Sequence, residues 1–372
     1  MKFAHIADCH IGAWKEEKLR ELNIKTFKAA IEICINENVN FILICGDLFD
    51  SVLPPINLIK DVVRLLKQLK DNNIPCYVIA GSHDFSLTGK TMLKVFEEAD
   101  LVKDVANNGF VTDKTGVKIA GLYGKKTSLE IEDYKKLNKD LLESESGFKI
   151  FMFHTALNEF KPEPEIQGME YTNLPKNFSY YAGGHVHYIF DIIKNEYGRI
   201  VYPGALFPNN FKELWDFKSG GFFIFENNNL IYKKIILKDT LNIEIDISNK
   251  SIYEIREELF NLKDYEDKIL LLKFMGELNG SISGLKLNEI TFKNAFVVLK
   301  NLSRIKTKEA KEVILKEENI EEQLIEEYNT EFKDLIKDLM IILDKEKEEG
   351  EKNIDFEKRI IEEATKHLNL FN

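Results

Sequence analysis

The sequence predicts an α/β fold in which two β-sheets pack face to face, because strand-like runs alternate with helical patterns along most of the 372 residues. Amphipathic helical patterns at 17–36 and 58–71 separate the first three of these runs. Such alternation is typical of sheets whose strands are buried on both faces. The runs are KFAHIA, NFILIC, CYVIAG, KIFMF and SYYAGG, with further runs VKIAGLYG, RIVYPG, GGFFIFENNN and LIYKKIIL that indicate the second sheet.

The composition is that of a globular protein, with 44% hydrophobic and 30% charged residues. No apolar run approaches the roughly 18 residues that a membrane-spanning helix needs. The first apolar stretch is interrupted at Asp8, before a signal peptide could form, so we expect a cytoplasmic protein without a membrane association. The four cysteines follow no metal-binding spacing, and we interpret them as free thiols in a reducing compartment.

Composition also divides the chain into three expected domains. Residues 1–238 hold the alternating pattern, and residues 239–305 are predicted to form a small α+β domain. Within residues 306–372, apolar side chains recur every three or four positions, as in two amphipathic helices. The apolar face of these helices either packs back on the chain or docks on a partner. The positions are Leu324, Tyr328, Phe332, Leu335, Leu339, Ile342, Leu343, Ile360, Ile361, Ala364 and Leu368.

The net charge of −11 does not exclude a nucleic-acid substrate. Residues 306–372 contain 12 basic and 20 acidic residues, so the first 305 residues carry a net charge of only −3. Bound metal ions can supply positive charge where a phosphate must lie. The sequence nevertheless shows no strong basic patch.

Polar residues follow the predicted strands at the point where each strand ends. Ligands of open α/β sheets bind beyond the carboxyl ends of the strands, so we expect these residues to share one site. Residues two apart in an extended segment point the same way, which allows a DxH or HxH motif to direct two ligands into one cavity. The residues are Asp8 and His10, Asp47 and Asp50, Ser82, His83 and Asp84, His154, and His185 and His187.

Imidazole and carboxylate ligands together suit Mn, Fe or Zn, and a carboxylate can bridge two ions. Two ions about 4 Å apart can hold the attacking and leaving oxygens of a phosphoryl displacement. Each motif alone is weak, but five of the seven histidines follow apolar strands. We interpret His5, in the middle of a strand, and His367, late in a helix, as structural residues.

The ordered motifs DxH, GDxxD, GxHD, a lone strand-end His and GHxH resemble those of the calcineurin-like metallophosphoesterases. The stretches FAHIADCHIG, FILICGDLFD and YPGALF resemble, more narrowly, the double-strand-break repair nucleases of the MRE/SbcD family. This resemblance covers the chain to about Phe225. It implies a two-sheet sandwich with a DNA-capping domain and helices that bind a RAD/SbcC-type ABC ATPase.

Matched position by position, the resemblance implies that Asp8, His10 and His187 hold one metal ion. His154 and His185 would hold the other, and Asp47 would bridge the two. The family usually has Asn where this chain has Ser82, so a hydroxyl would replace an amide as a ligand of the second metal.

The resemblance also implies two catalytic residues. His83 matches the catalytic histidine, which orients the scissile phosphate or protonates the leaving oxygen. Asp50 is the last residue of GDxxD and would hydrogen-bond His83, favouring its protonated form. We interpret Asp84 as a cap of the following helix.

The function expected from these motifs is a Mn-dependent DNA exonuclease and endonuclease of double-strand-break repair. A hydroxide held between two Mn ions, with Mg, Fe or Zn as alternatives, would attack the phosphorus in line, and His83 would assist the departing 3′-oxygen. An ABC ATPase would be the partner. A homodimer is also expected, with 58–69 and 92–96 as candidate contacts that could equally be core.

Two other functions stay open. The first is a calcineurin-like phosphodiesterase or phosphatase that acts on a substrate other than DNA, with the same active site. The second is a scaffold subunit with a degenerate metal site, which Ser82 alone favours. The additional C-terminal third favours the DNA nuclease over a small-molecule enzyme, which does not need it.

Overall fold

The computed structural model describes residues 1–85, 91–106, 109–125, 130–161, 166–278 and 280–307, together with Arg359 and Thr365. These residues belong to two compact units. The first contains residues 1–246, 258–274 and 288–303, and the second contains 247–257, 275–287 and the described residues from 304 onward. The predicted helical tail lies almost entirely outside the described residues, and the predicted domain boundaries remain predictions.

The first sheet has six strands in the order β12-β11-β1-β2-β3-β4. Its strands β1, β2, β3 and β4 run parallel, while β11 and β12 add an antiparallel edge. Parallel strands buried on both faces are expected to be continuously apolar, and β2 is buried along its whole length. The strands are β1 (Lys2–Ile6), β2 (Phe41–Cys45), β3 (Cys76–Ile79), β4 (Lys103–Asp104), β11 (Gly220–Glu226) and β12 (Asn229–Ile235).

The second sheet also has six strands, in the order β5-β6-β7-β8-β10-β9. Its inner strands β6, β7, β8 and β10 are parallel, and both edge strands pair antiparallel. The strands are β5 (Val111–Thr112), β6 (Lys118–Gly121), β7 (Lys149–His154), β8 (Tyr180–Gly184), β9 (Ile189–Lys194) and β10 (Gly198–Pro203). The predicted two-sheet α/β fold is therefore confirmed.

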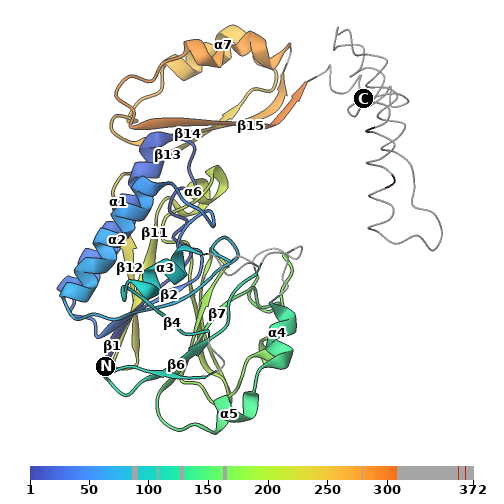
Figure 1. The fold of residues 1–372 in the computed structure, drawn as a ribbon. Coiled ribbons are helices and arrows are strands. Elements are labelled where there is room, and N and C mark those ends of the chain that lie inside the picture. Colours follow the sequence, from blue (N-terminus) through green and yellow to red (C-terminus); the bar gives the residue numbers. More distant parts are fainter. Residues whose placement is uncertain are drawn as a thin grey trace. The chain divides into compact units, whose positions relative to one another are not determined.

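Helices cover the outer faces of both sheets (Figure 1). On the first sheet lie α1 (Glu17–Asn36), α2 (Ile56–Asp71) and α3 (Met92–Glu98), whose apolar residues share one core with that sheet. The second sheet is covered by α4 (Ile131–Lys136) and α5 (Lys139–Ser144). Between the sheets lies an aromatic core in which the Phe3 ring stacks on Phe41 and Phe225 at centroid distances of 5.1 and 4.8 Å.

The expected dimer contacts lie in α2 (residues 58–69) and α3 (residues 92–96). Most of their apolar side chains face the core. Leu58, Val62, Leu66 and Leu69 of α2 and Phe96 of α3 are at most 5% exposed. Their sequence pattern is thus explained by packing on the first sheet. Exposed apolar side chains in this region are instead Ile56 and Val95.

A third, three-stranded sheet follows in the chain, in the order β13-β14-β15. Its strands are β13 (Thr240–Asp246), β14 (Ile269–Leu278) and β15 (Val297–Thr307), and α7 (Ile252–Phe260) lies between the first two in sequence. Within the first compact unit, Ile269, Leu271 and Val297 share a core with Trp14 and Leu214. Leu214 belongs to α6 (Phe211–Phe217), a short helix between β10 and β11. Among the described residues, no helix has the length and apolar content needed to cross a bilayer.

His5 is a structural residue of β1, as the sequence indicated. Its side chain is completely buried, with Nδ1 3.0 Å from the Tyr180 hydroxyl and Nε2 3.1 Å from the Gly183 carbonyl oxygen. These partners suit a neutral ring that donates from Nε2 and accepts at Nδ1. Burial lowers the pKa of His5 from 6.5 to about 3.

We expect His5→Gln to reduce the pH dependence of stability. In the unfolded chain His5 binds a proton below pH 6.5, whereas in the folded chain it does so only near pH 3. The unfolded state therefore binds more protons in this window, and the free energy of unfolding falls by about 1.4 kcal/mol per unit of acidification from this group alone. Urea unfolding at several pH values measures the slope. Tyr180→Phe is the control, since it keeps the imidazole and should keep the slope; equal slopes for His5→Gln and the parent chain would contradict the assignment.

Candidate metal centre

The predicted site residues lie where the parallel strands of the two sheets end. Asp8 and His10 follow β1, Asp47 follows β2, and His185 follows β8. All four have positive φ, at 51°, 41°, 50° and 84° respectively. Left-handed backbone is sparsely populated by residues other than glycine and concentrates at functional sites. Its occurrence at four positions along one edge indicates that these side chains are directed to a common point.

Two motif glycines allow the sheets to approach each other at this edge. A Cβ on Gly46 would overlap the His154 ring, and a Cβ on Gly184 would overlap the Cys45 carbonyl oxygen. Gly46 also has a φ of +87°. The glycines of the GD and GH motifs therefore occupy positions where a larger residue would separate strand ends that carry site residues.

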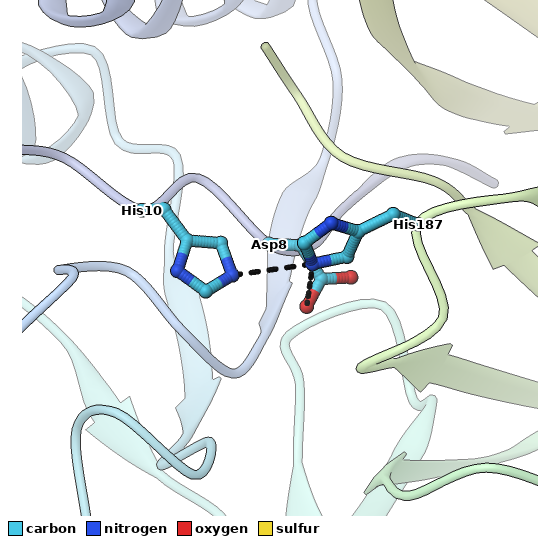
Figure 2. A group of neighbouring side chains, drawn as sticks. All are labelled: Asp8, His10 and His187. Carbon is cyan, nitrogen blue, oxygen red and sulfur yellow. Dashed lines mark hydrogen bonds and ion pairs between the residues drawn. The ribbon is translucent and has the colours of Figure 1, made fainter. Parts of the chain in front are cut away.

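Asp8, His10 and His187 form the first cluster (Figure 2). His10 Nε2 lies 3.3 Å from His187 Nε2, and His187 Nε2 lies 3.9 Å from Asp8 Oδ1. Asp8 is completely buried, and its carboxylate accepts the His185 backbone N–H at 2.9 and 3.1 Å. Three ligand atoms from β1 and β8 thus converge within the reach of one cation.

The opposite nitrogens of both imidazoles are held by carboxylates. His10 Nδ1 lies 3.2 Å from Asp50 Oδ1, and His187 Nδ1 lies 3.0 Å from Glu213 Oε1. Each Nδ1 can therefore donate a proton to its carboxylate, which leaves Nε2 as the ligand atom of each ring. If both rings are neutral, their Nε2 lone pairs face each other at 3.3 Å and repel unless a proton or cation lies between them. These residues therefore fit a metal ion.

His154, Asp47 and Asp8 form a second, fully buried cluster. His154 Nδ1 lies 2.8 Å from the Cys45 carbonyl oxygen, to which it donates, so Nε2 is the free ligand atom. This Nε2 is buried without a hydrogen-bond partner and lies 3.2 Å from Asp47 Oδ2. The His185 ring is the next imidazole along this edge, with its centroid 5.3 Å from that of His154.

Asp47 lies between the two clusters. Its Oδ2 is 3.2 Å from His154 Nε2 and 3.5 Å from His10 Nε2. Its other oxygen, Oδ1, accepts the His83 backbone N–H at 2.8 Å, which fixes the orientation of the carboxylate. One carboxylate next to an imidazole of each cluster has the arrangement of a bridging ligand.

The charged groups of the site strongly shift one another's pKa values. Burial raises the pKa of Asp8, partly offset by His187 and His154. Burial would also raise the pKa of Asp47, but His154 and His10 hold it well below its usual range. For His154, burial acts to lower the pKa, yet Asp47 and Asp8 raise it to about 10. The carboxylates thus create a negative potential at His154 Nε2, which favours a cation there.

His185 has the opposite perturbation. Burial, and then the charge of His154, lower the pKa of its imidazole to about 3. At neutral pH this ring is therefore uncharged and has a lone pair available to a metal. Metal ligation requires neutral imidazole, so the site should bind metal more weakly as the pH falls.

His83 and Asp50 lie together at the outer side of the clusters. His83 Nδ1 is 2.8 Å from the backbone carbonyl oxygen of Asp50 and 3.6 Å from its Oδ1. The Asp50 carboxylate lies closer to His10 than to His83, so it contacts a metal-site histidine as well as the predicted catalytic one. Ser82 Oγ donates to Asp47 Oδ2 at 3.3 Å. The sequence-predicted residues are thus brought together, while their roles remain predictions.

Asp84 does not cap the following helix, and that interpretation was wrong. Its buried carboxylate accepts the backbone N–H groups of Leu48 and Phe49 at 2.9 and 3.1 Å. Thr91 caps α3 instead. Asp84 therefore holds the GDxxD loop, because backbone donors in a buried turn need an acceptor more than an exposed helix end does.

Glu213 is the residue that sequence reasoning missed. It lies in α6, and its Oε2 accepts the Asn209 backbone N–H at 2.8 Å while its own N–H donates to Asn210 Oδ1 at 2.9 Å. Asn210-x-x-Glu213 is a capping arrangement, which was the available signal. Burial acts to raise the pKa of Glu213, but the hydrogen bond and charge of His187 lower it. The carboxylate is thus ionised and fixes the His187 ring.

A cavity of about 440 Å³ opens onto these residues. It is lined by His10, Asp47, His83, His185 and His187. The clusters are therefore accessible to a substrate, and the arrangement suits metal-assisted displacement at phosphorus.

Comparison with known proteins agrees with this chemistry. Residues 1–188 match the family model of the calcineurin-like phosphoesterases. The DNA double-strand break repair protein Mre11 of Methanococcus maripaludis is 29% identical over 355 residues, covering 88% of this chain and 90% of the relative. Mre11 of Methanocaldococcus jannaschii is 30% identical over 273 residues (68% and 71%), and Mre11 of Sulfurisphaera tokodaii is 35% identical over 187 residues (49% and 48%).

We expect Glu213→Gln to weaken Mn²⁺ binding about tenfold, because an amide no longer attracts the Nδ1 proton of His187. Calorimetric titration of the purified chain with Mn²⁺ measures the affinity. Asp216→Asn, on the same helix and lining the same cavity, is the matched control and should leave the affinity unchanged. Equal affinities of Glu213→Gln and the parent chain would refute the orienting role.

Proposed function

Because the chain belongs to the calcineurin-like phosphoesterases and, within them, to the Mre11 family of metal-dependent nucleases, we propose that it hydrolyses DNA phosphodiesters in double-strand break repair as a Mn-dependent exonuclease and endonuclease. The observation that carries the proposal is the convergence of the Nε2 atoms of His10 and His187 at 3.3 Å, beside Asp8 and Asp47. Such a donor set suits a cation, and the adjoining cavity admits a substrate.

In this proposal Asp8, His10 and His187 hold the first metal, and His154 and His185 hold the second. Asp47 bridges them, and Ser82 contributes to the second site. Mixed imidazole and carboxylate ligands suit Mn, with Mg, Fe and Zn as the other candidates. When bound, the ions acidify the attacking water and neutralise charge that develops on the phosphate.

His83 serves the leaving group. Its side chain is 43% exposed and lines the cavity, while Nδ1 is engaged by the Asp50 carbonyl oxygen. Nε2 is therefore the atom left to face the substrate, where it donates a proton to the departing 3′-oxygen. Asp50, near both His83 and His10, positions the two rings relative to each other.

The partners are proposed on family grounds. The three-stranded sheet and α7 would contact the DNA duplex. Residues 306–372, almost all of which lie outside the described residues, would bind an ABC-type ATPase. Exposed Ile56 and Val95 in the α2–α3 region are compatible with a homodimer contact.

Digestion assays with the full-length chain test the function. With Mn²⁺ we expect cleavage of linear duplex, hairpin and single-stranded DNA, and no cleavage with a chelator or in the Asp8→Asn variant, which loses a metal ligand. Bis(p-nitrophenyl) phosphate reports the phosphodiesterase centre independently. Hydrolysis of this small diester without any DNA cleavage would favour the non-DNA phosphodiesterase, and no bound metal together with no activity would favour the scaffold.

Asp50→Asn should move the pH–rate profile of DNA cleavage. If His83 acts as a general acid, activity is lost at high pH as the ring loses its proton. Removing a neighbouring negative charge favours the neutral form of an imidazole, so the high-pH limb should move to lower pH. Steady-state rates between pH 5.5 and 9.5 at saturating Mn²⁺ measure this, and Asp216→Asn is the control. An unmoved limb would count against a contact between Asp50 and the acid.

A further inference from the structure

Three cavities of the first compact unit adjoin one another, starting at the metal centre. The first, described above, shares His187 and Asp216 with a second cavity of about 350 Å³. The second shares Ser219 and Lys234 with a third of about 330 Å³. Because neighbouring cavities share wall residues, the three lie in succession and lead away from His187; we call this succession the groove.

The far end of this groove is basic. Four lysines line the third cavity, together with a single acidic residue, Asp239. Lys238 is paired with Asp267. Over the part of the chain that the structure describes, the other three form no ion pair, namely Lys218, Lys234 and Lys268. In a chain whose net charge is −11, three cations without counter-ions at one place indicate an anionic ligand.

The middle cavity has a different character. Its walls include the aromatic rings of Phe217 and Tyr232 and the apolar side chain of Ile189. Phe217 is held edge-on by Tyr188 at a centroid distance of 4.8 Å, and Tyr232 by Phe223 at 5.1 Å. These aromatic rings lie between the metal centre and the lysines. The rings offer a surface on which DNA bases can stack, and the lysines offer positive charge for the phosphates. Proteins that bind single-stranded nucleic acid use this combination.

We infer that the groove is a binding track for one strand of DNA, leading from the scissile phosphate at His187 to Lys218, Lys234 and Lys268. This inference rests on the proposed function and adds the path of the substrate beyond the reacting phosphate. The bases pass Phe217 and Tyr232, and the phosphates beyond them pair with the three lysines. A small diester reaches the metal centre without using the track.

The triple variant Lys218→Gln, Lys234→Gln and Lys268→Gln tests the track. Binding of a fluorescent single-stranded oligodeoxynucleotide to the full chain, with Ca²⁺ in place of Mn²⁺, is measured over a range of salt concentrations. We expect affinity to fall about tenfold or more at low salt, and the slope of log K against log salt to decrease by about two, since each lost phosphate contact contributes about 0.7. Hydrolysis of bis(p-nitrophenyl) phosphate with Mn²⁺ should be unchanged.

The matched control replaces three exposed lysines elsewhere by Gln, at Lys28, Lys67 and Lys136. Thermal unfolding checks that both triples remain folded. An unchanged salt slope in the track variant, or the same loss in both triples, would overturn the track while DNA cleavage by the parent chain stands. If the parent chain hydrolyses the small diester but neither binds nor cleaves DNA, the proposed function itself fails.

Discussion

The structure depends on the buried carboxylate of Asp8, which joins the two sheets at their common edge. Asp8 follows β1 of the first sheet, and its carboxylate accepts the N–H of His185, which follows β8 of the second. Its backbone N–H donates to the Gly46 carbonyl oxygen at 3.2 Å, and its own carbonyl oxygen accepts the Leu206 N–H at 3.2 Å. One residue therefore ties four chain segments together, and two of them carry the further site residues Asp47 and His185.

Concentrating carboxylates in this way has an energetic cost that the surrounding groups must offset. Asp8, Asp47 and Asp84 are each at most 4% exposed, and burial, together with the charge of Asp47, acts to raise the pKa of Asp8 and Asp84. A buried ionised group is stable only when it is paired and hydrogen-bonded. Backbone N–H groups and the imidazoles satisfy part of this demand, and divalent cations would satisfy more of it when bound. Stability and metal affinity are consequently linked, since an ion that binds only the folded chain stabilises it.

The fold and most of the site follow from patterns that are local in sequence. The strands were recognisable because both faces are buried, and α1 was predicted with its observed bounds because its apolar residues recur at helical spacing. Site residues such as Asp47 could be identified because parallel strands deliver their carboxyl ends to one edge. Such patterns predict which residues lie at one edge of the sheet, but not which of their atoms are in contact.

The sequence did not reveal the contacts between residues that are far apart in the chain. Asp50 was expected to face His83 alone, yet its carboxylate lies closer to His10, 40 residues away. Asp84 was assigned to a neighbouring helix, whereas its two shortest hydrogen bonds are to backbone groups 35 and 36 residues away. Glu213 reaches His187 from a seven-residue helix that is too short to show a periodic pattern. The capping spacing marks Glu213 as a helix-start residue, but only the tertiary structure shows that it orients His187.

Helix α6 connects the orientation of a site histidine to the packing of the three-stranded sheet. Glu213 on one side of the helix orients His187, while Leu214 packs with Ile269, Leu271 and Val297 of the three-stranded sheet. At the end of the helix, the Trp215 carbonyl oxygen accepts a hydrogen bond from Asn242 Nδ2 of β13 at 2.7 Å. Since His187 Nδ1 follows the Glu213 carboxylate, displacement of α6 relative to β1 would turn the imidazole away from His10. The orientation of His187, a predicted metal ligand, is therefore set in part by the packing of α6 against the three-stranded sheet.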